Sequence, residues 1–223
     1  MREYEQTVGR ANTCDVGGGI VFYPLNMKAA IFTKVDVKST GTVAQDTGVM
    51  YSKTQSLKVS SDAATPEVDD ETQAVATCGL RGAHIVVVEY KARSATGSAG
   101  ETNGIEIVTE LKNVFTTLGI RWNGTQCTFE YMDTAGVYRE CGCGTLKWND
   151  LQWYRISAVL DLKKGEYKEI TVNGIHVITG PVLGKNDPVT TSDCGMTVKL
   201  ISKVTNLLQS VNNFDELLIT EAV

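Results

Sequence analysis

WYRISAVLDLKKGEYKEITVNGIHV, residues 153–177, has the most regular pattern in this chain. Apolar and polar residues alternate on either side of a Lys-Lys-Gly segment at 163–165, and an Asn-Gly pair follows at 173–174. Alternation with a period of two is the pattern of a β-strand that buries one face. Asn-Gly suits a two-residue type I′ turn, because both central residues need positive φ. The stretch therefore predicts two consecutive hairpins.

The two turns set the register of the three strands. The Asn-Gly turn pairs Val172 with Ile175 and Ile170 with Val177, and a three-residue loop at 163–165 pairs Ala158 with Ile170 and Ile156 with Val172. A slip of one residue would turn every side chain over, so the agreement of both hairpins supports this register. We expect one buried face made of Tyr154, Ile156, Ala158, Leu160, Ile170, Val172, Ile175 and Val177. We expect the other face to carry Trp153, Arg155, Ser157, Thr171 and His176.

Similar strand patterns fill the rest of the 223 residues, and turns rich in Gly, Asn, Asp and Ser separate them every 8 to 14 residues. Helical periodicity is nearly absent. This spacing is typical of an antiparallel sandwich or barrel. We expect an all-β protein, a two-sheet antiparallel β-sandwich, in a single domain over 1–223.

Composition excludes some partners. The net charge is −5 and no run of Lys and Arg stands out, so nothing indicates nucleic-acid binding. The longest apolar runs are too short to span a membrane. The first residues, MREYEQTVGR, are charged and lack an apolar signal region. We expect a cytoplasmic protein if this sequence is full length, and a secreted one if a signal peptide was removed. The oligomeric state stays open.

The six cysteines contain no CxxC pair, which makes a zinc ribbon a poor explanation. Cys127 is expected to lie across a hairpin from Cys141 and Cys143. A disulfide there and a cluster of three thiols are both open, and reduced, mostly buried thiols are the favoured reading.

Several segments resemble the concanavalin A-like lectin/glucanase superfamily, which includes laminin-G-like domains and many carbohydrate-binding modules. They are YSKTQSLKV (51–59), GIRWNG (119–124), WNDLQWYRI (148–156), the hairpin stretch and FDELLIT (214–220). GIRWNG and WNDLQWYRI are also similar to a bacterial branch of that superfamily. The resemblance covers roughly residues 50–220 and implies a jelly roll of two packed sheets, one of them concave.

No catalytic residue is assigned. Laminarinase-type glycoside hydrolases on this fold use three acids at alternate strand positions. In EIVTE, Glu106 and Glu110 match the outer two positions, but Val108 replaces the central acid. We therefore expect both glutamates to face solvent.

Carbohydrate binding is expected to use aromatic faces with nearby polar groups. The candidates are Trp122, Trp148 and Trp153, with Arg155 on the face of Trp153. The resemblance also implies a structural Ca²⁺ held by Asp215 and by carbonyl groups, such as those of DVGGGI at 15–20.

The leading hypothesis is a non-catalytic, carbohydrate-binding-like protein whose partner is an oligosaccharide or polysaccharide. One alternative is a glycan-active enzyme, a glycoside hydrolase or lyase, on the same fold. A second alternative is a structural or assembly subunit, for which an exposed apolar patch would be evidence.

Overall fold

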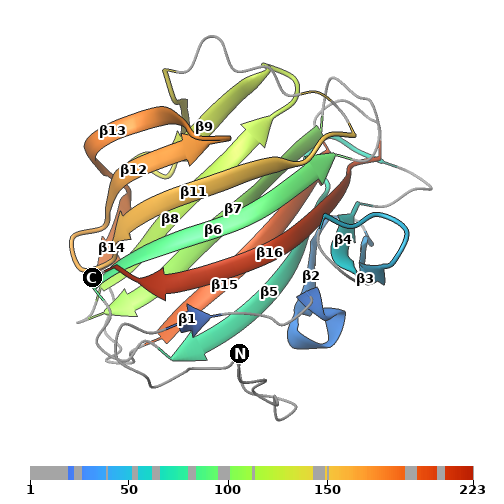
Figure 1. Cartoon of the computed structure of the whole chain (residues 1–223), viewed down its shortest axis with the longest axis horizontal. Coiled ribbons are helices and arrows are strands. Elements are labelled where there is room, and N and C mark those ends of the chain that lie inside the picture. The colour runs from blue at the N-terminus through green and yellow to red at the C-terminus, as the bar shows by residue number, and fades with distance from the viewer. Residues whose placement is uncertain are drawn as a thin grey trace.

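The computed structural model describes residues 20–22, 27–38, 40–51, 55–61, 66–79, 84–94, 101–111, 114–142, 149, 151–188, 195–204 and 209–222. Most of these lie in antiparallel strands that form two stacked sheets (Figure 1). Besides strands there is a short 3-10 helix, η2 (Ala29–Ile31). Within the described ranges, no helix has the length and apolar character needed to cross a bilayer. The predicted two-sheet antiparallel β-sandwich is confirmed.

Sheet A lies toward the viewer in Figure 1. Its strands are, in spatial order, β13 (Ile175–Leu183), β12 (Glu166–Val172), β11 (Tyr154–Asp161), β6 (Ile85–Ser94), β16 (Val211–Glu221), β4 (Ser56–Ser60) and β3 (Thr42–Asp46), and β1 (Ile20–Phe22) pairs with β16.

Sheet B lies behind it. Its strands are, in spatial order, β10 (Tyr138–Glu140), β9 (Thr128–Met132), β8 (Val114–Asn123), β7 (Glu101–Leu111), β15 (Gly195–Val204), β5 (Glu71–Gly79) and β2 (Thr33–Val37), and β14 (Lys185–Pro188) pairs with β8.

The core lies between the sheets. Alternate residues of β6 and β15 are buried, which is the burial pattern of strands that cover a core with one face. Sheet A contributes large side chains such as Tyr90 and Phe214, and sheet B contributes Ile107, Leu118 and Leu200. Sheet B therefore turns its other side chains to the outside, where its outer face carries the polar residues considered below.

The predicted hairpins form, and most of their register is confirmed. Val172 pairs with Ile175, Ala158 with Ile170, and Ile156 with Val172. Asn173 and Gly174 have φ values of 50° and 81°, as a type I′ turn requires. The buried set is confirmed for Tyr154, Ile156, Ala158, Leu160, Ile170, Val172 and Val177.

Two details of the second hairpin are wrong. A bulge shifts the β12–β13 register, so Ile170 pairs with Ile178 rather than Val177, and both of those β13 residues are buried. Ile175 was expected in the buried face but is 51% exposed. It lies at the turn end of β13, the outermost strand of sheet A.

A second bulge changes the first hairpin. The turn covers residues 162–165, one residue more than predicted, and Gly165 has the expected positive φ of 68°. A regular register would place Lys168 opposite Leu160. Instead Tyr167 pairs with Leu160 and is completely buried. The bulge in the β11–β12 pairing thus directs the side chain of Tyr167 into the core.

Three cysteines fall within the described residues, Cys78, Cys127 and Cys141, and all three are in the reduced form. Cys127 and Cys141 are therefore not joined by a disulfide across the hairpin. Cys14, Cys143 and Cys194 lie outside the described residues.

The buried hairpin face generates a stability prediction. Replacing Ile170 with Ala should lower the free energy of unfolding by about 2–5 kcal/mol, because it removes a fully buried side chain and leaves a cavity. Ile175→Ala is a matched control on the neighbouring strand and should change it by less than about 0.5 kcal/mol. Urea unfolding of both variants measures the difference. Equal losses would contradict the assignment of the two residues to buried and exposed positions.

Candidate functional site

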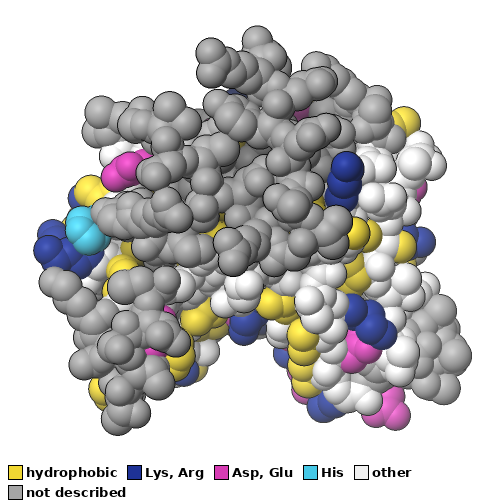
Figure 2. All heavy atoms as spheres, turned by 90° about the horizontal axis from the view of Figure 1, so that it is seen from below, with side chains coloured by type: hydrophobic (Ala, Val, Ile, Leu, Met, Phe, Trp, Pro, Cys, Tyr) yellow, Lys and Arg dark blue, Asp and Glu magenta, His cyan; other side chains and the backbone are white. Residues whose placement is uncertain are grey.

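The outer face of sheet B is hollowed. Seen from below in Figure 2, a recess opens on the side of sheet B, with described side chains along its floor and its right-hand wall. Because inward residues alternate with outward ones, the outward residues of β7 include Gly104, Glu106 and Val108, and those of β15 include Lys199 and Lys203. The central strands β7 and β15 therefore form the floor of this recess, which is called the hollow below.

Glu106 is the centre of a polar cluster in the hollow. Its Oε1 accepts a hydrogen bond from the Tyr138 hydroxyl at 2.9 Å, and its Oε2 accepts one from Lys199 Nζ at 3.3 Å. The three side chains come from β7, β10 and β15, so the sheet brings together residues that are far apart in the sequence.

Arg121 on β8 extends the cluster. Its Nε donates to Glu130 Oε2 at 2.6 Å, and its guanidinium carbon lies 3.8 Å from the centroid of the Tyr138 ring. Asn123 donates a further hydrogen bond to the other oxygen of Glu130 at 2.9 Å. Arg121 is therefore held from two sides, by a carboxylate and by an aromatic face.

In this cluster the acids lie deeper than the cations. The side chain of Glu130 is 4% exposed and that of Arg121 is 23% exposed; Glu106 is 14% exposed and Lys199 is 28% exposed. The buried carboxylates fix the cations, and the cations are the part of each pair that reaches the solvent. At these two pairs a ligand therefore meets Arg121 and Lys199 before it meets Glu130 and Glu106.

Two glycines make room for these side chains. A Cβ atom on Gly119 would lie 2.5 Å from the Tyr138 hydroxyl, and one on Gly104 would lie 2.7 Å from Arg121 Cβ. Gly119 pairs with Glu106 and Gly104 with Arg121 across β7 and β8. A small pocket of about 20 Å³, enough for about one water molecule, lies among Gly104, Glu106, Arg121, Tyr138 and Lys203.

Tyr138 keeps its proton at neutral pH. Burial raises the pKa of its hydroxyl well above the usual value, and the negative charge of Glu106 raises this pKa further. The group is consequently a hydrogen-bond donor, and it donates to Glu106 Oε1.

The cluster corrects the expectation for EIVTE. Glu106 does not face solvent freely but is bound by Tyr138 and Lys199, and Glu110 is half-buried. No sequence motif indicated Arg121, Glu130 or Lys199 as site residues. Glycine inside a strand at 104 and 119 was the available signal, because it marks a close approach of other atoms.

The predicted tryptophan sites do not come together. Trp122 is 4% exposed and packs on Phe129 in the core, so its ring offers no face to a sugar; alternation with Leu118 and Ile120 places it inward. Trp148 lies outside the described residues. Trp153 is half-buried and Arg155 is exposed, and both lie on the outer face of sheet A, away from the hollow.

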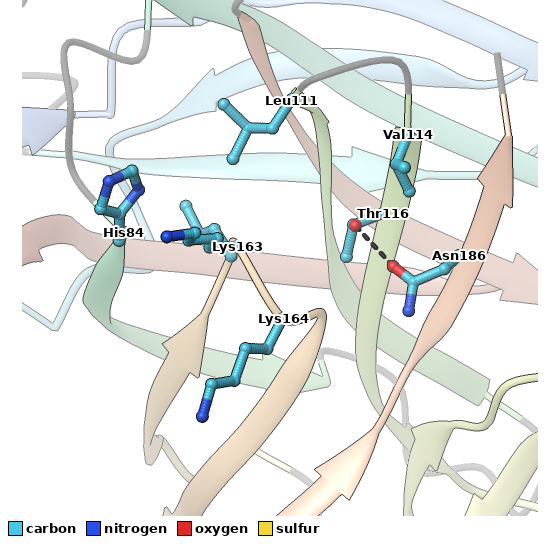
Figure 3. Close-up of a pocket in the computed structure, with 8 residues that line it drawn as sticks. His84, Leu111, Val114, Thr116, Lys163, Lys164 and Asn186 are labelled. Atoms are coloured by element: carbon cyan, nitrogen blue, oxygen red, sulfur yellow. Dashed lines mark hydrogen bonds between the residues drawn. The ribbon is translucent and has the colours of Figure 1, made fainter.

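A second concavity lies at one end of the sandwich. It measures about 420 Å³ and is lined by His84, Leu111, Val114, Thr116, Leu162, Lys163, Lys164 and Asn186 (Figure 3). Its walls are mainly aliphatic, and the Thr116 hydroxyl donates a hydrogen bond to Asn186 Oδ1 at 2.6 Å. The eight lining residues include no carboxylate. The hollow, in contrast, combines carboxylates, cations and a phenol, which are the groups that can bind and react with a polar ligand.

Asp215 is buried, and both of its carboxylate oxygens accept backbone N–H groups. Its Oδ2 accepts the Tyr51 N–H at 3.0 Å and its Oδ1 accepts the Glu216 N–H at 2.7 Å. Its role as a Ca²⁺ ligand stays a prediction. Of the residues that the structure describes, no three His, Cys, Asp or Glu side chains gather into a metal site. Residues 15–19 of DVGGGI lie outside the described residues.

The contacts of Asp215 allow a test of whether the protein binds Ca²⁺ there. Asp215→Ala should destabilise the fold by about 1–3 kcal/mol, because it leaves the partly buried N–H groups of Tyr51 and Glu216 without this acceptor. The melting temperature of the unsubstituted protein should be the same with Ca²⁺ and with a chelator. A native state that bound Ca²⁺ would instead melt higher as Ca²⁺ is added, and this rise would disappear in Asp215→Ala.

No family model matches this sequence, and no curated protein matches it significantly in sequence. Solved structures do match. They include an endo-β-1,4-glucuronan lyase from the fungus Trichoderma reesei, with a TM-score of 0.57, 11% identity, and coverage of 83% of this chain and 89% of that one. The cellulose-induced protein Cip1 gives a TM-score of 0.59 at 15% identity, with 86% and 91% covered.

The alginate lyase vAL-1 from a Chlorella virus also matches, with a TM-score of 0.52, 10% identity, and coverage of 92% of this chain and all (100%) of that one. Identities this low establish the fold and nothing finer. The chain therefore has the concanavalin A-like jelly-roll fold that its sequence segments resemble.

Proposed function

We propose that this protein binds a uronic-acid-containing polysaccharide in the hollow of sheet B. The observation that carries the proposal is the layering of the cluster, in which buried Glu130 and Glu106 hold the more exposed Arg121 and Lys199. A sugar carboxylate fits beside these cations, since a guanidinium or ammonium group forms strong hydrogen bonds with a carboxylate. Two structures with the same fold are lyases of glucuronan and alginate, which supports this ligand class.

Binding should depend on the cations of the hollow. Arg121→Gln should weaken the binding of an oligouronate about ten- to hundred-fold, as expected for the loss of a charged hydrogen bond. Arg139→Gln is a matched control: Arg139 follows Tyr138 on β10, is exposed and pairs with Asp133. Calorimetric titration with alginate and glucuronan oligomers provides the measurement. If Arg121→Gln and Arg139→Gln bound equally well, the hollow would not be the site.

A second function, cleavage of the bound chain by β-elimination, is favoured by the Tyr138–Glu106 hydrogen bond. Arg121 and Lys199 would stabilise the charge that develops on the uronate carboxylate. Glu106 would take the proton from C5, and Tyr138 would give its proton to the leaving O4 oxygen. The C4–O4 bond breaks and a C4=C5 double bond forms. Tyr138 then recovers its proton from Glu106 through the 2.9 Å hydrogen bond.

Elimination has a direct signature, the ultraviolet absorbance of the new double bond conjugated with the carboxylate. Tyr138→Phe should lower the rate about 10²–10⁴-fold, because it removes the proton donor, while binding changes little. Unaltered turnover in Tyr138→Phe would contradict the assigned role. If oligouronates bind to the unsubstituted protein and no absorbance develops, the elimination is excluded and the binding proposal stands.

A further inference from the structure

An exposed aromatic pair lies on the outer face of sheet A, on the opposite side of the sandwich from the hollow. The rings of Tyr51 and Trp153 are 6.0 Å apart and inclined at 71°, an edge-to-face contact. Tyr51 is 51% exposed and Trp153 is half-buried. The two residues are distant in the sequence. Tyr51 is bound through its N–H to Asp215 of β16, and Trp153 directly precedes β11.

Lys91 of β6 fixes the tyrosine ring. Its Nζ lies 3.7 Å from the centroid of the Tyr51 ring and 3.4 Å from Glu216 Oε2, and its side chain is only 12% exposed. A lysine held by both an aromatic face and a carboxylate has lost most of its rotamer freedom. The aromatic pair is therefore ordered before any ligand arrives.

Polar groups surround the pair. Arg155 lies opposite Lys91 in the β11–β6 register, and its Nη2 is 2.6 Å from Glu89 Oε1. Met50 directly precedes Tyr51 and Leu151 lies two residues before Trp153, and both are exposed. The surface thus has an apolar centre with planar donors and acceptors beside it.

We infer that this surface, formed by Tyr51, Trp153, Lys91, Arg155 and Glu89, is a second carbohydrate-contact site that stacks a pyranose ring of a neutral glycan. The C–H face of a sugar ring packs on an aromatic ring, and hydroxyl groups need donors and acceptors side by side.

Charge distinguishes this site from the hollow. Glu216 is more exposed than its partner Lys91, at 41% against 12%, so a negative charge, not a positive one, reaches the solvent in that pair. In the other pair Arg155 is the more exposed member. The surface therefore presents both signs and offers no net attraction to a polyanion, which favours a neutral chain. The inference does not depend on the function proposed for the hollow.

Tryptophan fluorescence and NMR titrations with neutral hexasaccharides, made of β-1,4-glucose, β-1,3-glucose and β-1,4-mannose, test the inference. We expect saturable binding to at least one of them, and a loss of affinity of about tenfold or more in Tyr51→Ala and in Trp153→Ala. Leu183→Ala, an exposed apolar residue elsewhere on sheet A, is the matched control and should bind normally. Arg121→Gln in the hollow should also leave this binding intact.

Thermal melts of each variant separate lost contacts from lost folding, and Tyr51→Ala serves if Trp153→Ala unfolds. The inference is overturned if none of the hexasaccharides binds, or if both aromatic variants bind as well as the unsubstituted protein. It is also overturned if sedimentation shows a dimer that Tyr51→Ala dissociates, because the surface would then be an interface between two copies of the chain.

Discussion

The hydroxyl of Tyr167 holds the two sheets and the hollow in their relative positions. It accepts the N–H of Gly119 at 2.7 Å and lies 3.0 Å from the carbonyl of Gly119 and 3.1 Å from that of Met132, to one of which it donates. Along the edge of β8, pairing with β14 ends at Thr117 and pairing with β9 begins at Ile120. Tyr167 thus forms hydrogen bonds with backbone groups of Gly119 that neither β14 nor β9 pairs with. A buried backbone group without a hydrogen-bond partner would lower the stability of the fold.

Gly119 also positions the polar cluster of the hollow. Gly119 lies opposite Glu106 on β7 and directly under the Tyr138 hydroxyl, where a Cβ would collide. A shift of β8 at this point would change the Tyr138–Glu106 distance and the position of Arg121 two residues further along the strand. The chemistry proposed for the hollow needs these groups within hydrogen-bonding distance, so it depends on a side chain that never contacts the ligand.

The alternation of apolar and polar residues predicts some features of this structure and not others. Period-two patterns predicted the sandwich, both hairpins and the buried faces of β11 and β12, because each needs only local order. They could not show the bulges, since an extra residue in a strand leaves the sequence pattern unmarked. Tyr167 was missed for that reason. The error on Trp122 was avoidable: Leu118, Ile120 and Trp122 alternate, and the first two are plainly core residues.

The polar cluster was beyond the reach of local patterns, because Glu106, Arg121, Tyr138 and Lys199 lie on four strands and each alone looks like a solvated position. The pairing of β7 with β8 and β15, together with the pairing of β9 with β8 and β10, makes them neighbours. Burial then decides what they present. In the hollow both cations are more exposed than their acids, whereas on sheet A Glu216 is more exposed than Lys91 and Arg155 is more exposed than Glu89, so both signs reach the solvent there. A charged chain is attracted by unlike charges and repelled by like charges, so the depth of each partner matters more than its identity in distinguishing the face proposed for uronates from the face proposed for neutral sugars.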